Sequence, residues 1–421
     1  MHYELIVAGG YIMTKKLKGA CVFGQSGGPT SVINASAYGV IKTALETPEI
    51  TNVYGAAHGI TGVLNDTLYD LGKEDAFELQ LLLNTPSSAL GSCRYKIKDT
   101  KDLERIHEMF VKHDIRYFFY NGGNDSMDTC MKVSNYLQQV GYECRVIGVP
   151  KTIDNDLCGT DHCPGYGSAA KYIATTVAEV YKDSIVYDTG TVTIVEIMGR
   201  HAGWLTGAAA LAELSGAAPD YIYLPEIPFD MGYFLHKVES AYKANGNCLV
   251  AVSEGIRYPE GSFVSEAKPS STDGFGHEQL GGLAATLAAV VKQRTGAKVR
   301  GIELSLLQRC GAHLASQTDI DEAFLAGKAA VECALSGETG KMVAFTREGS
   351  GDAYKCGIIF QPIDVCANEE KKVPREWINE TGTYVTQEFI DYALPLIQGE
   401  NTRVIENGLP RFAKLKKSVV R

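Results

Sequence analysis

The sequence has no run of roughly 18 to 20 uninterrupted apolar residues, the length that a membrane-spanning helix requires. Its first residues, MHYELIVAGGYIMTKKLKGA, do not combine a basic stretch, an apolar core and a small-residue cleavage site, so they do not resemble a secretion signal. The formal net charge of −10 argues against a nucleic-acid partner, because such binding needs a basic face. These absences predict a cytoplasmic protein that binds neither membrane nor nucleic acid.

The eleven cysteines are scattered singly and form no CxxC pair, as expected for buried thiols in a reducing compartment. Cys158, His162 and Cys163 lie close together in LCGTDHCPG and could bind a metal. A zinc site needs about four ligands, however, and no second cluster offers the rest. We therefore do not expect zinc here.

The sequence also has neither of the common nucleotide-binding patterns, GxxxxGK[ST] and GxGxxG. Instead, glycine-rich stretches follow two predicted strands: GQSGGPTS at 24–31, with Gly27 and Gly28, and YNGGNDSMD at 120–128, with Gly123. A glycine turn between a strand and a helix directs backbone N–H groups and a helix N-terminus at an anion. Two such turns on one sheet would hold adjacent phosphoryl groups or one polyphosphate.

Strand and helix patterns alternate through most of the 421 residues, which predicts an α/β fold with two lobes, each a mostly parallel sheet flanked by helices. We expect one lobe over 1–165, completed by about 310–360, a second over 166–309, and a C-terminal extension over 361–421 packed on both. The segment 258–277 is interpreted as a loop or lid, and the tail RFAKLKKSVVR as a solvated basic end. Predicted strands cover 18–23, 115–120, 145–149, 191–197, 221–224, 248–252 and 299–306, with helices at 101–113 and 127–140.

Strong polar clusters follow these strands, so we expect them to line one cleft between the lobes. In PKTIDND, an extended backbone would direct Asp154 and Asp156 to one side, with Lys151 close by. Two carboxylates beside a lysine suit a general base, a metal partner and a charge clamp for phosphoryl transfer. The alternative is an Asx-rich turn whose carboxylates cap the next segment.

Arginines next to glycines also follow strands, and they are candidates for phosphate binding. Each alone could form a surface salt bridge, but together they suit bidentate recognition of phosphate. Glu254 in AVSEGI could accept hydrogen bonds from sugar hydroxyls or form a buried ion pair. The arginines are Arg94, Arg200, Arg300 and Arg309.

The motifs GQSGGPTSVINA, LGSCR, GGNDS, PKTIDND, EIMGRHAG, SEG and LQR occur in the order in which the phosphofructokinase family has them. The chain resembles that family from about Lys18 to beyond Gly327. The resemblance implies transfer of a phosphoryl group to the 1-hydroxyl of fructose 6-phosphate, with Mg²⁺, in a cleft between two α/β lobes. It also implies a homodimer or homotetramer, because in this family an arginine that binds the 6-phosphate of the sugar can come from a neighbouring subunit.

By position, Asp154 resembles the family's general base, with Thr152 beside the transferring group and Asp156 near the metal. Lys151 and Asp125 complete the residues implied in catalysis, and Asn124, Asp125 and Asp156 those implied in metal binding. The residues implied in donor binding, in the first lobe, are Gly27, Gly28, Arg94, Gly123, Asn124 and Ser126. Those implied in sugar-phosphate binding are Thr152, Ile153, Asp154, Asp156, Met198, Gly199, Arg200, Glu254, Arg300, Leu306 and Arg309.

Two positions bear on the phosphoryl donor. ATP-using members of the family typically have glycine where this chain has Asp125 and Lys151, whereas the pyrophosphate-using branch has Asp and Lys. An Asp side chain would fill the space and copy the charge of the nucleotide α-phosphate, and Lys would add a cation for the smaller donor. The resemblance therefore implies pyrophosphate as donor and a reaction that is near reversible.

The chain departs from the family pattern at three positions. Asn124 stands where many members have a metal-binding Asp, Leu306 where the family usually has His or Tyr, and Thr191 where bacterial ATP-using members have a neighbouring-subunit arginine. A longer ketose phosphate is therefore an alternative acceptor. Two alternative functions also stay open, an ATP-dependent 6-phosphofructokinase and a catalytically silent regulatory subunit.

Overall fold

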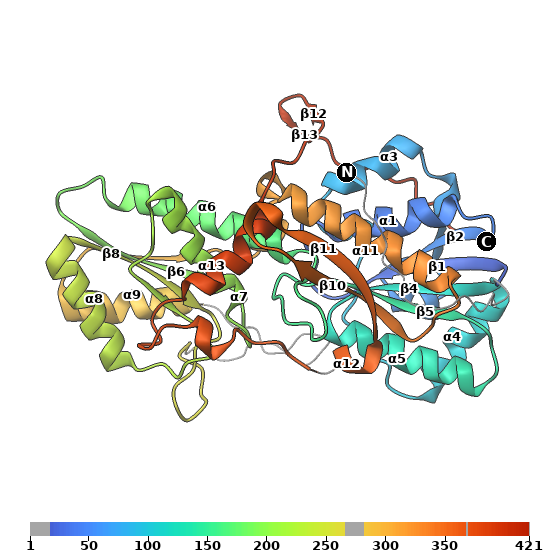
Figure 1. Ribbon diagram of the computed structural model, residues 1–421, viewed down its shortest axis with the longest axis horizontal. Helices are drawn as coiled ribbons and strands as arrows, with labels where there is room; N and C mark the ends of the chain where they lie inside the picture. The colour runs from blue at the N-terminus through green and yellow to red at the C-terminus, as the bar shows by residue number, and fades with distance from the viewer. Residues whose placement is uncertain (1–16, 266–281, 368, 421) are drawn as a thin grey trace.

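The computed structural model describes residues 17–265, 282–367 and 369–420, which form two α/β lobes lying side by side (Figure 1). The predicted fold class is thus confirmed. The proposed loop or lid at 258–277 and the N-terminal stretch fall largely or wholly outside the described residues. Within the described parts of the chain, no helix is long and apolar enough to cross a membrane.

The first lobe is built on a seven-stranded sheet with the order β11-β10-β5-β4-β1-β2-β3. Strands from β10 to β2 run parallel, and the edge strands β3 and β11 are antiparallel to their neighbours. Its strands are β1 (Gly19–Gln25), β2 (Ile50–Ala56), β3 (Leu68–Asp70), β4 (Ile115–Gly122), β5 (Arg145–Pro150), β10 (Lys341–Glu348) and β11 (Lys355–Pro362).

Apolar side chains alternate between the two faces of this sheet, so each face packs against its own helices. On one face Phe23 and Phe119 pack with helices α1 and α11, and on the other Val22 and Phe118 pack with α4 and α5. The helices of this lobe are α1 (Ile33–Leu45), α2 (Ile60–Leu64), α3 (Ala76–Gln80), α4 (Thr100–Lys112), α5 (Asn124–Gln139), α11 (Gln317–Leu335) and α12 (Ile363–Cys366).

The second lobe contains a four-stranded, fully parallel sheet with the order β7-β8-β6-β9. Its apolar residues form one cluster against α6, α7 and α13, and another against α8 and α9. The strands are β6 (Thr191–Ile197), β7 (Tyr221–Tyr223), β8 (Asn247–Ser253) and β9 (Val299–Glu303). The helices are α6 (Tyr166–Ser184), α7 (Trp204–Gly207), α8 (Met231–Asn245), α9 (Leu283–Thr295), α10 (Leu307–Cys310) and α13 (Gln387–Ala393).

The chain after α12 returns from the first lobe to the second and then back again (Figure 1). Phe389 and Tyr392 of α13 pack into the apolar cluster around Trp204 in the second lobe. The last described residues then pair with the first lobe, where Tyr69 bridges Val419 and Arg411 forms an ion pair with Glu78.

The prediction of a solvated basic tail is confirmed for the side chains of Lys414, Lys416 and Lys417, which are exposed, but the backbone of the tail is bound to the first lobe. Backbone N–H groups of Lys414, Lys416 and Lys417 donate to the carboxylates of Glu78 and Glu74, in addition to the β-bridge. The two glutamates that accept these bonds lie more than 300 residues earlier in the sequence. A compositional argument could not detect this long-range pairing.

The predicted strands correspond to β1 and β4 to β9, with ends that differ by at most three residues. The predicted helix at 101–113 is α4, and the helix predicted from 127 begins earlier, at Asn124. This early start matters for function, because it places Asn124, Asp125 and Ser126 of GGNDS in the first turn of α5.

Candidate active site

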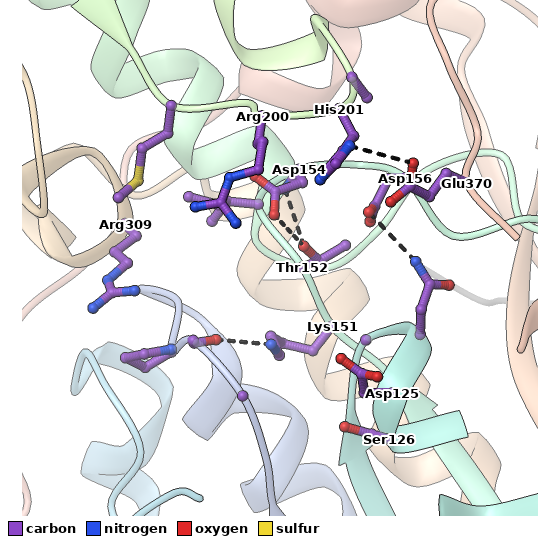
Figure 2. A pocket seen from close by; sticks show the side chains of 18 of the residues that line it. Asp125, Ser126, Lys151, Thr152, Asp154, Asp156, Arg200, His201, Arg309 and Glu370 are labelled. Atoms are coloured by element: carbon purple, nitrogen blue, oxygen red, sulfur yellow. Dashed lines mark hydrogen bonds and ion pairs between the residues drawn. The ribbon is translucent and has the colours of Figure 1, made fainter. Parts of the chain in front are cut away.

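A cavity of about 520 Å³ lies between the lobes, at the carboxyl ends of their strands (Figure 2). The first lobe contributes the loops after β1, β4 and β5, and the second contributes the loops after β6 and β8 together with Arg309. The residues that line it are Gly27, Gly28, Pro29, Arg94, Gly123, Asn124, Asp125, Ser126, Lys151, Thr152, Ile153, Asp154, Asp156, Met198, Arg200, His201, Ala202, Glu254, Arg309 and Glu370.

The glycine loop after β1 lies beneath two guanidinium groups. A Cβ atom added to Gly28 would come within 3.2 Å of Arg309 Nη1 and 3.6 Å of Arg94 Nη2. Glycine at this position therefore leaves both guanidiniums close to the backbone of the loop. Burial, together with the positive charges of Arg309 and Arg200, lowers the pKa of Arg94. An anion in the cavity would relieve this crowding of positive charge.

The second glycine loop leads into the first turn of α5, so the N-terminus of a 16-residue helix faces the cavity. Asp125 in that turn forms a 3.0 Å ion pair with Lys96, which lies two residues after Arg94. The ammonium of Lys96, in the LGSCRYK segment, thus balances the negative charge of the Asp125 carboxylate. Ser126 is buried beside it and also lines the cavity.

Lys151 is almost fully buried at the end of β5. Its Nζ donates a 2.7 Å hydrogen bond to the carbonyl oxygen of Gly28, so the side chain extends from the end of β5 to the glycine loop after β1. Burial lowers the pKa of Lys151 to about 8, although Asp154 opposes this shift. The ammonium therefore gains from any anion that enters the cavity.

Asp154 and Asp156 both reach the cavity, but not from the extended backbone that the sequence predicted. Asn155 between them has a φ of 56°, in the left-handed region, and its buried side chain donates to Tyr392 Oη and accepts from Cys163 N–H. These bonds fix a turn, to which asparagine is well suited. The two carboxylates are thus brought together by a buried amide in the turn.

Burial dominates the protonation of these acids. It raises the pKa of Asp154, while the charge of Lys151 and a hydrogen bond from Thr152 Oγ1 favour the carboxylate. Burial, then the charges of Asp154 and Glu370, raises the pKa of Asp156 to about 7. A cation bound in the cavity would stabilise the ionised form of both carboxylates.

The second lobe contributes the MGRH loop after β6 and Glu254 after β8. Gly199 has a φ of 131°, and a Cβ there would come within 2.6 Å of the Ala202 carbonyl, so only glycine fits this turn. Its N–H donates to Glu254 Oε1 at 3.4 Å. Burial and the nearby Asp154 raise the pKa of Glu254 to about 7. Arg200 Nε is buried and has no hydrogen-bond partner among the described residues, which suits it to bind a ligand oxygen.

Three of the residues expected at the site do not line this cavity. Gly199 acts through the backbone turn just described. Leu306 is 53% exposed, and Arg300 lines a separate cavity of about 280 Å³ with Thr191 and Tyr187. There Arg300 lies 3.6 Å from Asp183 in an exposed ion pair.

Sequence reasoning missed two ionisable residues of the cavity, His201 and Glu370. The signal for His201 was present, since it directly follows Arg200 in MGRH. Glu370 belongs to the segment after α12, and it reaches the cavity because its backbone forms a bridge with Leu157. His201 Nδ1 lies 4.0 Å from Glu370 Oε2 (Figure 2).

The oxygen atoms at the start of α5 fit a magnesium ion. The side-chain amide of Asn124 lies 3.4 Å from Asp156 Oδ2, and Glu370 lines the same part of the cavity. Carboxylate and amide oxygens are ligands suited to Mg²⁺. The candidate zinc residues, by contrast, are used otherwise, since buried His162 is hydrogen-bonded to Asp161 and Glu322.

Comparisons with known proteins agree with this geometry. The family model described as Phosphofructokinase matches residues 21–334. A pyrophosphate–fructose 6-phosphate 1-phosphotransferase of Halomonas elongata is 46% identical over 403 residues, covering 94% of this chain and 96% of that protein. One of the same name from Xanthomonas campestris is 46% identical over 410 residues, covering 96% and 97%. The crystal structure of a pyrophosphate-dependent phosphofructokinase from Marinobacter aquaeolei matches with a TM-score of 0.87 and 43% identity, covering 96% and 97%.

Fold, cavity and comparisons together define a two-lobed α/β phosphotransferase. More particularly, the chain belongs to the phosphofructokinase family. The resemblance inferred from the motifs is thereby confirmed.

Proposed function

We infer that this protein transfers a phosphoryl group from pyrophosphate to the 1-hydroxyl of fructose 6-phosphate, giving fructose 1,6-bisphosphate and phosphate, in a reversible reaction. The observation that carries the choice of donor is the buried Lys151, whose Nζ lies between the two glycine loops at 2.7 Å from the Gly28 carbonyl. The near full-length relatives that bear the name of this activity support the same conclusion. The ATP-dependent alternative has no comparable support.

The donor phosphates would bind between the glycine loops of the first lobe. Their oxygens would accept hydrogen bonds from the N–H groups at the start of α5 and from Ser126, and would be neutralised by Lys151 and Arg94. The Asp125 carboxylate, held by Lys96, would occupy the space and copy the charge of a nucleotide's α-phosphate. A nucleotide would therefore meet both steric and electrostatic opposition, whereas pyrophosphate would not.

The sugar phosphate would bind on the second-lobe side of the cavity. Arg200, Arg309 and Glu254 line the cavity. The two arginines would bind the 6-phosphate, and Glu254 would accept hydrogen bonds from sugar hydroxyls. Met198 and the turn at Gly199 would fix the position of the ring. Acceptor and donor would then lie on opposite sides of Asp154.

Asp154 would act as the general base, accepting the proton of the 1-hydroxyl on a carboxylate oxygen. Thr152 Oγ1 lies 3.3 Å from Asp154 Oδ2 and accepts from the Asp154 N–H at 3.1 Å, so it fixes the position of the base. Lys151 lowers the cost of ionising Asp154 and would neutralise negative charge on the transferring group.

The metal proposed for this reaction is Mg²⁺, held by Asn124 and Asp156. When bound, it would neutralise charge on the donor phosphates and orient them. Asp125 is a weaker candidate ligand, because its carboxylate already pairs with Lys96. The protein's own groups would still bind both substrates and hold the base.

Arg300 and Leu306 suggest how subunits would contribute to the site. Both are about half exposed and outside the cavity of their own chain. We propose that the protein is a homodimer or homotetramer in which Arg300 binds the 6-phosphate held by a neighbouring subunit. Thr191 shares the second cavity with Arg300. It would stand where bacterial ATP-using members of the family have a second arginine that reaches a neighbouring subunit.

The direct test is to incubate the purified protein with fructose 6-phosphate, pyrophosphate and Mg²⁺ and to identify the products by ³¹P NMR. We expect fructose 1,6-bisphosphate and phosphate, and the reverse conversion when these two are supplied. Turnover of a longer ketose phosphate in place of fructose 6-phosphate would change the acceptor but keep the class. A failure to turn over any sugar phosphate would instead support the regulatory-subunit alternative.

A further inference from the structure

The orientation of the Asn124 amide is set by the chain that follows α12. With its nitrogen turned toward that segment, Asn124 donates to the carbonyl oxygens of Cys366 at 2.9 Å and Glu369 at 3.1 Å. With the amide turned the other way, its nitrogen donates one longer bond, to Asp156 Oδ2 at 3.4 Å, and its oxygen faces the two carbonyl oxygens, which cannot donate. Hydrogen bonding therefore selects the first orientation.

This orientation leaves two oxygens facing each other. Asn124 Oδ1 takes the position that lies 3.4 Å from Asp156 Oδ2, and once Asp156 is ionised neither of these oxygens can donate a hydrogen. Adjacent ligand oxygens of an octahedral Mg²⁺ lie roughly 3 Å apart, given metal–oxygen distances of about 2.1 Å. The pair is thus spaced for two neighbouring positions around a divalent cation.

The segment that orients Asn124 also brings Glu370 to the site. Its backbone is fixed by the bridge between Leu157 and Glu370 and by a 2.7 Å hydrogen bond from Lys371 N–H to the Asp156 carbonyl. Trp204 Nε1 donates to the Lys371 carbonyl at 2.9 Å and holds the segment from the other side. The Glu370 side chain remains 41% exposed and lines the cavity.

Charge supports a shared ligand set. Glu370 and Asp156 line the same cavity, and the backbone of Glu370 pairs with Leu157, the residue that follows Asp156. Asn124 provides only a neutral oxygen. Glu370 would restore the second carboxylate, and a site with two carboxylates binds Mg²⁺ more tightly than a site with one.

We propose that Glu370, from the C-terminal segment, is a ligand of the divalent cation together with Asn124 and Asp156. This inference rests on the proposed function, in which the cation accompanies the donor phosphates. It assigns a catalytic-site role to a residue outside the segment that matches the family model, residues 21–334. The position of His201, 4.0 Å from Glu370, would then keep the carboxylate directed into the cavity when the cation is absent.

The test measures cation binding directly, by titrating the full chain with Mn²⁺ and following free Mn²⁺ by electron paramagnetic resonance, without substrates. We expect Glu370→Gln to raise the dissociation constant on the order of tenfold, because one of the two carboxylates is lost. The matched control is Glu369→Gln. It removes the same charge from the neighbouring residue, whose side chain does not line the cavity. It should leave the dissociation constant within about twofold.

Equal Mn²⁺ affinity in Glu370→Gln and the wild type would overturn the inference, as would an equal loss in both variants, which would indicate general electrostatics. Glu370→Asp, which keeps the charge on a shorter side chain, should fall between the wild type and Glu370→Gln. Thermal unfolding without metal checks that the variants fold. Turnover with pyrophosphate is measured in parallel, so a wild type that binds Mn²⁺ but does not turn over would refute the proposed function and not the ligand assignment.

Discussion

Lys151 Nζ donates a 2.7 Å hydrogen bond to the carbonyl oxygen of Gly28, so a buried ammonium links the end of β5 to the glycine loop after β1. The contact places a positive charge beside the glycine loop after β1, in the cavity that we propose as the donor site. Burial of this lysine lowers its pKa to about 8, so keeping the side chain charged costs free energy.

The lowered pKa predicts a pH dependence. Below about pH 8 Lys151 is protonated and attracts pyrophosphate, and above it the charge is lost, so kcat/KM for pyrophosphate should fall as pH rises through about 8. The check is the pH profile of kcat/KM for the wild type and for Lys151→Arg. Arginine stays charged, so its profile should show no such fall beyond the ionisation of pyrophosphate, which is common to both. The same basic limb in both proteins would refute the assignment.

The assignment of Asp154 as general base predicts a loss of chemistry with little loss of binding. Asp154→Asn should lower kcat by roughly 10² or more while the protein still binds fructose 6-phosphate. The matched control is Asp128→Asn on α5, which removes a carboxylate that pairs with Lys132 and does not line the cavity. Steady-state kinetics and ligand titration of both variants decide the point, and an Asp154→Asn variant with near wild-type kcat would contradict the mechanism.

The placement of Arg300 predicts complementation between subunits. Arg300→Ala should raise KM for fructose 6-phosphate, and Asp154→Asn should abolish turnover, each in its own homo-oligomer. In hybrids formed by unfolding and refolding the two variants together, some sites combine an intact Asp154 with an intact Arg300 from the neighbour. Activity at low fructose 6-phosphate should therefore exceed the sum of the separate variants. Strictly additive activity would place Arg300 outside the neighbouring site.

Much of the cavity could be predicted because polar residues that follow parallel strands must meet at one edge of the sheet. This rule placed Asp154, Arg200 and Glu254 together. It did not apply to Arg300, which is the second residue of β9 and so lies near the amino end of its strand. Glu370 could not be found in this way, because its position depends on backbone pairing with Leu157, more than 200 residues earlier in the chain.

The local conformation of the catalytic turn was harder to predict than its residues. Alternation suggested that Asp154 and Asp156 share one side of an extended strand, whereas the turn depends on the buried Asn155 and its bond to Tyr392. Tyr392 is a buried residue of α13, in the C-terminal part of the chain. Local patterns therefore identified the chemistry, and contacts distant in sequence determine its geometry.

The measurement that tests the central claim most directly compares pyrophosphate with ATP as donor, by initial rates with fructose 6-phosphate and Mg²⁺. It is made on the wild type and on the double variant Asp125→Gly with Lys151→Gly. The account predicts activity with pyrophosphate alone in the wild type, and a shift of selectivity toward ATP in the double variant, because space opens and opposing charge is lost. Wild-type turnover with ATP, or unchanged selectivity in the double variant, would contradict it.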